Sequence, residues 1–225
     1  MKQIDDIAVV IQARLSSKRI PKKMIKPFAG TTLTDIFLKK IKQCKSFPIQ
    51  NFYLSVYEPE LIDIGCKNEV NIFYRSKDSA ESEGTPMSLM YEWWDKLPHK
   101  YVVLINACVP FLKPETIDSF VSAYASSSAD GMFAVMEKKN YFWNQEKDLL
   151  TPLTEDVMNT KTVQKTYEAA HCLYAGKLTK IGSGIWMGDF NKPGDIELFS
   201  VEEAETLDID YPWQFDLCEK LWESK

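Results

Sequence analysis

The chain has 225 residues, 45% of them hydrophobic and 26% charged, with 27 Lys and Arg against 32 Asp and Glu for a formal net charge of −5. These values are typical of a folded globular protein that forms one domain, and they argue against a disordered chain. The negative balance also argues against general binding of nucleic acid, which requires a broad basic surface.

Short apolar runs alternate with stretches of helical periodicity over the first 136 residues. The runs rich in β-branched or aromatic residues predict strands over 7–11, 51–57, 69–75, 100–107 and 131–136. Apolar residues at helical spacing predict helices over 31–44, 59–68, 87–97 and 113–125. This alternation indicates an α/β fold of three layers, in which helices cover both faces of a mostly parallel, twisted sheet.

The periodicity weakens between residues 137 and 168. We interpret this segment as an excursion from the sheet that serves either as a subunit contact or as a flap over the acceptor. The chain then returns to a strand over 169–176, and it closes with a strand and a helix over 197–222. The segment 182–195 between them has turn composition and receives no assigned role. We expect residues 1–225 to form a single domain.

The densest positive charge of this acidic chain lies directly after the first predicted strand, in the stretch IQARLSSKRIPKK over 11–23. In parallel sheets, ligands bind beyond the carboxyl ends of the strands. Neither common glycine-rich phosphate motif occurs, so this loop would have to bind anions through its Arg, Lys and Ser residues. A solvated charged loop is the alternative interpretation.

A pair of carboxylates, Asp208 and Asp210, lies in the stretch ETLDIDYPWQF. On an extended segment, residues i and i+2 point to the same face. Two oxygen ligands of this kind suit Mg²⁺, which commonly binds one or two carboxylates together with substrate phosphates. The alternative is that one of them caps the helix that follows. The spacing alone leaves both interpretations open.

The stretch IQARLSSKRIPKKMIKPFAGTTL resembles the opening signature of the acylneuraminate cytidylyltransferase family, I-P-A-R-x-G-S-K-R-[IL]-P-x-K-N. These CMP-sialic acid synthetase-like enzymes are related to the CMP-Kdo synthetases. The resemblance implies a Rossmann-like nucleotidyltransferase fold that transfers CMP from CTP to a 2-keto-3-deoxy sugar acid and releases pyrophosphate. Gln12 and Ser16 depart from the signature, which commonly has Pro and Gly there.

The resemblance also implies roles for individual residues. The loop residues that match nucleotide-binding positions are Ala13, Arg14, Ser16, Ser17, Lys18 and Lys23. Weaker matches imply that Arg75, Gly84 and Thr85 contact the nucleotide, and that Asn106 and His171 contact the sugar acid. The family's closing segment E-x-x-D-I-D matches Glu205, Asp208 and Asp210, which implies that the two aspartates hold a catalytic Mg²⁺. The catalytic set is then Arg14, Lys18, Lys23, Asp208 and Asp210.

The identity of the acceptor stays open, because Met24, Val109, Leu112 and His171 differ from the family at positions where its sugar is expected. A lone His in a strand can also be purely structural. The nearest alternative enzyme is a metal-dependent glycosyltransferase that uses a nucleotide-sugar donor, since Asp208-x-Asp210 is also a D-x-D sequence. A non-catalytic nucleotide-binding protein is a third hypothesis.

The resemblance further implies a homodimer that activates sugars for surface polysaccharide.

The N-terminus places Asp5 and Asp6 before a short apolar run, which does not match a secretory signal, and no apolar run approaches the roughly 20 residues that span a bilayer. The five cysteines are scattered and include no C-x-x-C pair, which argues against disulfides and structural zinc. We therefore expect a cytoplasmic protein without a membrane partner.

Overall fold

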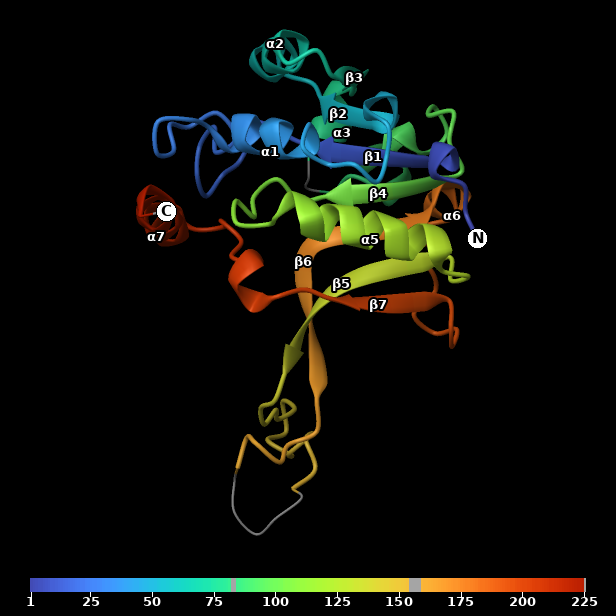
Figure 1. Cartoon of the computed structure of the whole chain (residues 1–225), viewed down its shortest axis with the longest axis vertical. Coiled ribbons are helices and arrows are strands. Elements are labelled where there is room, and N and C mark those ends of the chain that lie inside the picture. The colour runs from blue at the N-terminus through green and yellow to red at the C-terminus, as the bar shows by residue number, and fades with distance from the viewer. Residues whose placement is uncertain (82–83, 154–158, 225) are drawn as a thin grey trace.

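The structure, a computed structural model, describes residues 1–81, 84–153 and 159–224. Its seven strands form one sheet in the order β3-β2-β1-β4-β6-β5-β7 (Figure 1). The strands are β1 (Ile7–Gln12), β2 (Phe52–Val56), β3 (Asn71–Tyr74), β4 (Tyr101–Ile105), β5 (Gly131–Lys138), β6 (Thr166–Lys177) and β7 (Ile196–Ser200). The strand β6 is antiparallel to β4 and β5, whereas the other paired strands are parallel to each other. The predicted mostly parallel sheet is therefore confirmed.

Helices cover both faces of this sheet. The α-helices are α1 (Leu33–Ile41), α2 (Pro59–Lys67), α3 (Lys77–Ala80), α4 (Met87–Met90), α5 (Pro114–Ser126), α6 (Leu178–Gly182) and α7 (Pro212–Glu223). Short 3₁₀ turns are η1 (Ile4–Asp6), η2 (Ile49–Asn51), η3 (Glu92–Trp94) and η4 (Glu203–Glu205). Within the described ranges, no helix is long and apolar enough to cross a membrane. All five cysteines are free thiols.

The alternation of side chains along β1 explains the two helical layers. Ile7, Val9 and Ile11 face the larger core, which they share with apolar residues of α1, α5 and α7. Ala8 and Val10 face the opposite way, into a smaller core around η3 and α6. Each face of a sheet buried on both sides must be covered in this manner, and this gives the predicted three layers.

The helix predicted over 87–97 is wrong in its length. The α-helix ends at Met90, where the backbone of Tyr91 leaves the helical region at φ −109° and ψ 43°. The chain then continues as η3, which turns Trp93 fully into the smaller core at 0% exposure. The apolar spacing of this segment therefore reflects burial of the Trp93 ring by a 3₁₀ turn, and not one face of a continuous α-helix.

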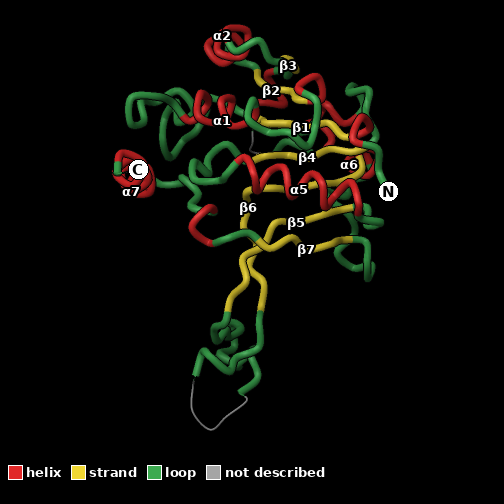
Figure 2. Tube along the Cα trace, viewed as in Figure 1, coloured by secondary structure: helices red, strands yellow, loops and turns green. Residues whose placement is uncertain are grey.

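The strands β5 and β6 extend beyond the sheet as a two-stranded stalk (Figures 1 and 2). Their last pair joins Lys138 to Thr166, and their register shifts between Phe133 and Val135. This stalk and the loop that it carries make up the segment 137–168, of which residues 154–158 lie outside the described part. The structure thus places this segment away from the sheet, and its use in dimerisation or acceptor binding stays a prediction.

The side chain of Lys2 ties the N-terminus to the end of α5. Its Nζ donates hydrogen bonds to the carbonyl oxygens of Tyr124, Ser127 and Ala129 at 3.2, 2.8 and 2.8 Å. The same ammonium lies 4.2 Å from the centroid of the Tyr124 ring. A cation at a helix C-terminus satisfies carbonyl groups that have no partner within the helix.

We therefore expect Lys2→Met to destabilise the fold by about 1–2 kcal/mol, which lowers the melting temperature by about 2–8 °C. Lys39→Met, at an exposed position on α1, is the matched control and should leave the melting temperature unchanged. Thermal unfolding followed by circular dichroism measures both variants. Equal melting temperatures for the two variants would contradict the role assigned to Lys2.

Candidate functional site

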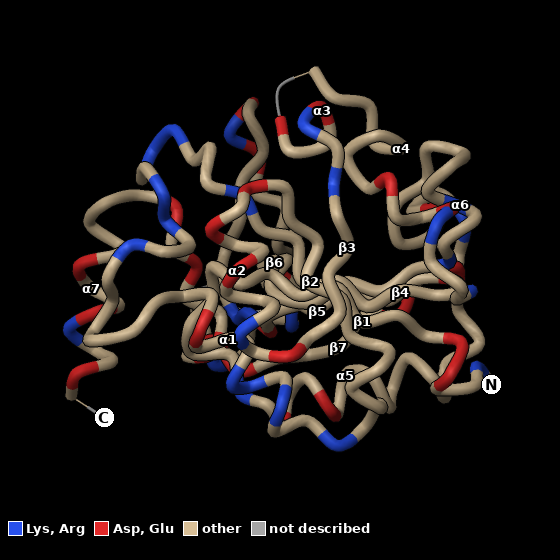
Figure 3. The backbone as a smooth tube through the Cα atoms, turned by 90° about the horizontal axis from the view of Figure 1, so that it is seen from above, with Lys and Arg blue, Asp and Glu red and all other residues tan. Residues whose placement is uncertain are grey.

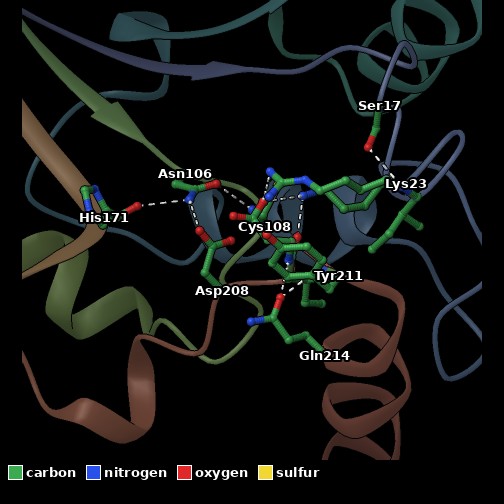
Figure 4. Close-up of polar contacts among 12 residues, drawn as sticks. Ser17, Lys23, Asn106, Cys108, His171, Asp208, Tyr211 and Gln214 are labelled. Atoms are coloured by element: carbon green, nitrogen blue, oxygen red, sulfur yellow. Dashed lines mark hydrogen bonds and ion pairs between the residues drawn. The ribbon is translucent and has the colours of Figure 1, made fainter.

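The segment before α7 is held between the loops that follow β1 and β4 (Figure 4). The backbone N–H of Ile209 donates to the carbonyl of Cys108 at 2.9 Å. On the other side, the ammonium of Lys23 donates to the carbonyl of Ile209. Lys23 is only 9% exposed. These two contacts bring the basic loop and the acidic pair to one edge of the sheet.

Asp208 is fixed by an amide from the end of β4. The Nδ2 of Asn106 lies 3.3 Å from Asp208 Oδ2 and also donates to the carbonyl of His171 at 2.9 Å. The Oδ1 of Asn106 accepts from the N–H of Cys108 at 2.9 Å, which sets the orientation of the amide. Burial, followed by the negative charge of Asp210, raises the pKa of Asp208. Its Oδ1 is buried and has no hydrogen-bond partner within the described residues.

Asp210 is paired with two cations of the basic loop. Its Oδ1 lies 2.8 Å from Arg19 Nη2 and 3.8 Å from Lys23 Nζ. The guanidinium of Arg19 also lies 4.9 Å from the centroid of the Tyr211 ring. The sequence analysis included Arg19 in the charge run but gave it no role, because nothing in the sequence pairs residue 19 with residue 210.

The capping interpretation of the acidic pair is wrong. The Oε1 of Gln214 accepts from the backbone N–H groups of Asp210 and Tyr211 at 2.7 and 2.8 Å, so Gln214 provides the cap of α7. Capping therefore does not account for the two carboxylates: Asp210 is paired with Arg19 and Lys23, and Asp208 keeps one oxygen without a partner among the described residues.

The fit of this pair to a metal ion depends on the ligands that would complete the shell. The described residues contain no group of three or more His, Cys, Asp or Glu side chains that could hold a metal. Mg²⁺, however, commonly takes one or two protein carboxylates and completes its shell with water and substrate phosphates. Two neighbouring carboxylates, one of them with an unpartnered buried oxygen, fit an ion of that kind.

The basic loop is folded against β2, α2 and α3. Ala13 N–H donates to the carbonyl of Ser55 at 3.0 Å, and Leu15 N–H donates to Glu58 Oε1 at 2.6 Å. The hydroxyl of Ser16 lies 3.4 Å from the Ala80 carbonyl, and Ser17 Oγ lies 3.4 Å from the N–H of Ile20. Acidic and basic positions are interspersed along the chain in Figure 3.

A small cavity of about 140 Å³ opens beside the end of β1. Its lining residues are Gln12, Arg14, Arg75, Ser79, Ala80, Glu81 and Met90. The buried guanidinium of Arg75 donates from Nε to Ser79 Oγ at 3.1 Å, and burial lowers its pKa to about 10. The structure thus brings Arg14 and Arg75 to the same cavity, and their contact with a nucleotide stays a prediction. Gly84 and Thr85 do not line this cavity, and the Thr85 hydroxyl instead donates to the Glu81 carbonyl at 2.8 Å.

His171 is exposed and lies in β6, where the register with β5 is irregular. Its backbone has a φ of +51°, a strained value for a residue with a side chain, and such strain is common at functional sites. The ring Nδ1 lies 3.1 Å from the hydroxyl of Tyr174. Since the His171 carbonyl accepts from Asn106, the structure brings together Asn106, His171 and Asp208.

Three of the positions expected near the acceptor do not face the site. Met24, Val109 and Leu112 are 4%, 0% and 0% exposed and belong to the larger core. The expectation that they alter a sugar contact is wrong, because an apolar side chain buried in this core packs rather than binds. Of the four positions, His171 alone is exposed.

Glu205 also has a structural role. Its Oε2 accepts from the N–H of Lys113 at 3.0 Å and from the hydroxyl of Thr116 at 2.7 Å, at the start of α5. A carboxylate there satisfies donors that the helix leaves unpaired.

A second cavity, of about 290 Å³, lies beside Asp208 and is lined also by Lys138 of β5, Trp213 and other residues of α7.

The chain is similar in sequence to a family of known proteins. A family model described as Cytidylyltransferase matches residues 8–179. The 3-deoxy-manno-octulosonate cytidylyltransferase of Rickettsia felis is 25% identical over 157 residues, which cover 68% of this chain and 54% of that protein. The spore coat polysaccharide biosynthesis protein SpsF of Bacillus subtilis is 23% identical over 132 residues, covering 56% of this chain and 53% of SpsF. The chain spans about half the length of the curated relatives it matches.

A solved structure resembles nearly the whole chain. The CMP:2-keto-3-deoxy-manno-octonic acid synthetase complexed with CTP superposes with a TM-score of 0.69. The match covers 97% of this chain and 98% of that one, at 13% sequence identity. At this identity the likeness shows the fold alone.

Asp208 is partly buried beside Asp210, with its Oδ1 fully buried, and this position leads to a prediction about stability. Asp208→Asn removes a buried negative charge but keeps an oxygen that can accept from Asn106. We expect the variant to be more stable by about 1 kcal/mol, with a melting temperature about 2–4 °C higher.

The matched control is Asp63→Asn at an exposed position of α2, which should not change the melting temperature. Both variants can be compared with the unmodified chain by differential scanning calorimetry. A melting temperature of Asp208→Asn at or below that of the unmodified chain would contradict the assigned electrostatics.

Proposed function

This chain belongs to the cytidylyltransferase family, and we propose that it transfers CMP from CTP to a 2-keto-3-deoxy sugar acid with release of pyrophosphate. The observation that carries the proposal is the meeting of the basic loop and the Asp208–Asp210 segment at the carboxyl edge of the sheet, through the contact of Lys23 with Ile209. The name of the Rickettsia felis relative supports an acceptor of the octulosonate kind, and a sialic acid-like acceptor is the related possibility that the sequence suggests.

The triphosphate would be bound by the basic loop. Arg14 can present two parallel donors to phosphate oxygens, whereas Lys18 and Lys23 act as point charges. The hydroxyls of Ser16 and Ser17 are further donors on the same loop. Positive charge at these positions would offset the charge that develops on the departing pyrophosphate.

The residues proposed to hold Mg²⁺ are Asp208 and Asp210. When bound, the ion would neutralise phosphate charge and help to align an in-line attack on the α-phosphorus. Asn106 positions Asp208 for this role, since its amide bonds both that carboxylate and the carbonyl of His171. Arg19 and Lys23 supply positive charge to Asp210.

The acceptor would lie between Asn106, His171 and the cavity of about 290 Å³ beside Asp208. An acidic acceptor needs a positive group or N–H donors for its carboxylate. Lys138 lines this cavity, where it is paired with Glu168 and Glu203, and the exposed ring of His171 lies on the neighbouring strand. The name of SpsF supports surface polysaccharide biosynthesis as the setting, which we propose to be cytoplasmic.

Pyrophosphate release tests this proposal directly. Incubation with CTP, Mg²⁺ and a panel of ulosonic acids should release pyrophosphate with at least one acceptor, and not without one. Absence of release with every acceptor, together with turnover of a CMP- or UDP-sugar donor, would contradict the proposal and favour the glycosyltransferase alternative.

The same assay separates catalysis from binding. We expect Asp208→Asn to lower turnover by roughly 10²–10³-fold, the scale on which one charge-stabilising group contributes. CTP binding, measured by calorimetry, should be partly retained, and Asp63→Asn should behave as the unmodified chain. Unchanged turnover in Asp208→Asn would favour a protein that binds nucleotide without a metal-dependent reaction.

We also propose that the chain forms a homodimer through the stalk. The stalk and its loop carry exposed apolar side chains, namely Phe142, Trp143, Leu150, Leu153 and Tyr167, between 37% and 62% exposed. Exposed apolar groups that cluster in this manner mark contact surfaces.

Light scattering at micromolar concentration should therefore give the mass of two chains. The double variant Leu150→Glu, Leu153→Glu should give the mass of one chain, because buried unpaired charges oppose the contact. Tyr74→Ser, at a 65% exposed aromatic position on β3, is the control and should stay dimeric. A mass of one chain for the unmodified protein would contradict the proposal.

A further inference from the structure

Gln12 departs from the signature that the rest of the basic loop resembles, and the structure gives it a specific partner. At the end of β1, its Oε1 accepts a hydrogen bond from the indole Nε1–H of Trp93 at 2.8 Å. A proline at this position would have no side-chain group able to make this contact. The pair is therefore a feature of this chain's own sequence.

The chemistry of the pair fixes the orientation of the amide. An indole nitrogen only donates, so it must meet the carbonyl oxygen of Gln12 and not its nitrogen. The Nε2 of Gln12, with its two N–H donors, must then point away from Trp93. Rotation of the amide by 180° would leave a fully buried indole donor facing another donor, which is unfavourable.

Trp93 is held rigidly in this position. Its ring is 0% exposed and packs in the smaller core with Ala8 and Val10 of β1. Its ring centroid lies 5.4 Å from that of Tyr91 and 6.3 Å from that of Trp186. Trp186 belongs to the turn-rich segment 182–195, to which the sequence assigned no role, and it stacks on Tyr91 at 4.5 Å.

Gln12 lines the cavity of about 140 Å³ that also includes Arg14 and Arg75. Sites for whole ligands usually have volumes of about 300–1,000 Å³, so this cavity suits one part of a nucleotide. Since the Oε1 of Gln12 is bound to Trp93, the group that Gln12 has left for a ligand there is its Nε2–H₂ donor. Ala80 and Glu81, which line the same cavity, bring carbonyl and carboxylate oxygens that can only accept.

This arrangement distinguishes the two pyrimidines. Cytosine presents an amino donor beside two acceptors, N3 and O2, whereas uracil presents a carbonyl beside an N3–H donor. Cytosine fits when its N3 meets the Nε2–H₂ group of Gln12 and its amino group meets the oxygens of Ala80 and Glu81, since each contact then pairs a donor with an acceptor. With uracil, the N3–H would face a donor that Trp93 prevents from turning. Sites built around such hydrogen bonds discriminate strongly, because the wrong ligand leaves buried groups unpaired.

We propose that Gln12 selects the cytosine ring of the nucleotide through its Nε2–H₂ group, and that Trp93 is the positioning residue that holds this group toward the cavity. The inference rests on the proposed use of CTP, which it deepens by naming the residues that choose the base. It assigns no new step to the reaction.

Calorimetric titration with CTP and UTP tests the proposal without any acceptor. The unmodified chain should bind CTP more tightly than UTP. Gln12→Leu should lower CTP affinity by about 10-fold or more and change UTP affinity little, because the proposed contact is to N3, which accepts a hydrogen bond in cytosine and is a donor in uracil. Trp93→Phe should instead raise UTP affinity, because the released amide can turn its oxygen toward N3–H.

Trp94→Phe is the matched control, since the indole N–H of Trp94 donates to the Ser88 carbonyl at 3.1 Å and not to Gln12. It should keep the CTP-to-UTP ratio of the unmodified chain. Gln12 is partly exposed at the end of β1, so we expect Gln12→Leu to fold. This variant tests the proposal even where Trp93→Phe fails to fold.

The outcomes separate the two levels of inference. An unchanged CTP-to-UTP ratio in Gln12→Leu, or equal binding of both nucleotides by the unmodified chain, would overturn the role of Gln12 and leave the proposed cytidylyltransferase activity standing. Failure of the unmodified chain to bind either nucleotide would overturn both.

Discussion

The buried ammonium of Lys23 is the contact on which the site depends. It donates to the carbonyl of Ile209 and lies 3.8 Å from Asp210, so it joins residues almost two hundred positions apart. The bond from Ile209 to Cys108, the bond from Asn106 to Asp208 and the ion pair of Arg19 with Asp210 hold the same segment from other directions. A lysine of this kind has two roles, since it fixes backbone geometry and leaves positive charge beside the carboxylates.

The charges around Lys23 explain how an acidic chain can maintain a strongly basic loop. Asp210 is paired with Arg19, and Glu58 accepts from the backbone of the loop at Leu15. Carboxylates of the chain itself therefore contribute to ordering the loop. Asp208 is the exception, because burial and its neighbour Asp210 raise its pKa and its Oδ1 has no partner in the described chain. Such an uncompensated group is costly to stability and is a common property of functional sites.

The strands, the mostly parallel sheet and the place of the basic loop at its carboxyl edge were predictable, because each depends on local periodicity or on the rule that ligands bind beyond the carboxyl ends of parallel strands. Local patterns failed where one side chain decided the local conformation, whether it is buried, as Trp93 is, or partly exposed, as Gln214 is. Trp93 ends the predicted helix 87–97 early, and Gln214 rather than an aspartate caps α7. Met24 and Leu112 lie in the core, although their positions in the sequence suggested a place beside the acceptor.

By itself, the sequence determined the fold class, the basic loop after β1 and the pair Asp208 and Asp210, since composition, period and short motifs are properties of neighbouring residues. Only the tertiary structure decided which distant groups meet. It paired Arg19 with Asp210, placed Asn106 between Asp208 and His171, and gave Gln12 the indole of Trp93 as its partner. The physical reason is that a hydrogen bond or an ion pair depends on distance in space, and the packing of the sheet and its helices sets that distance.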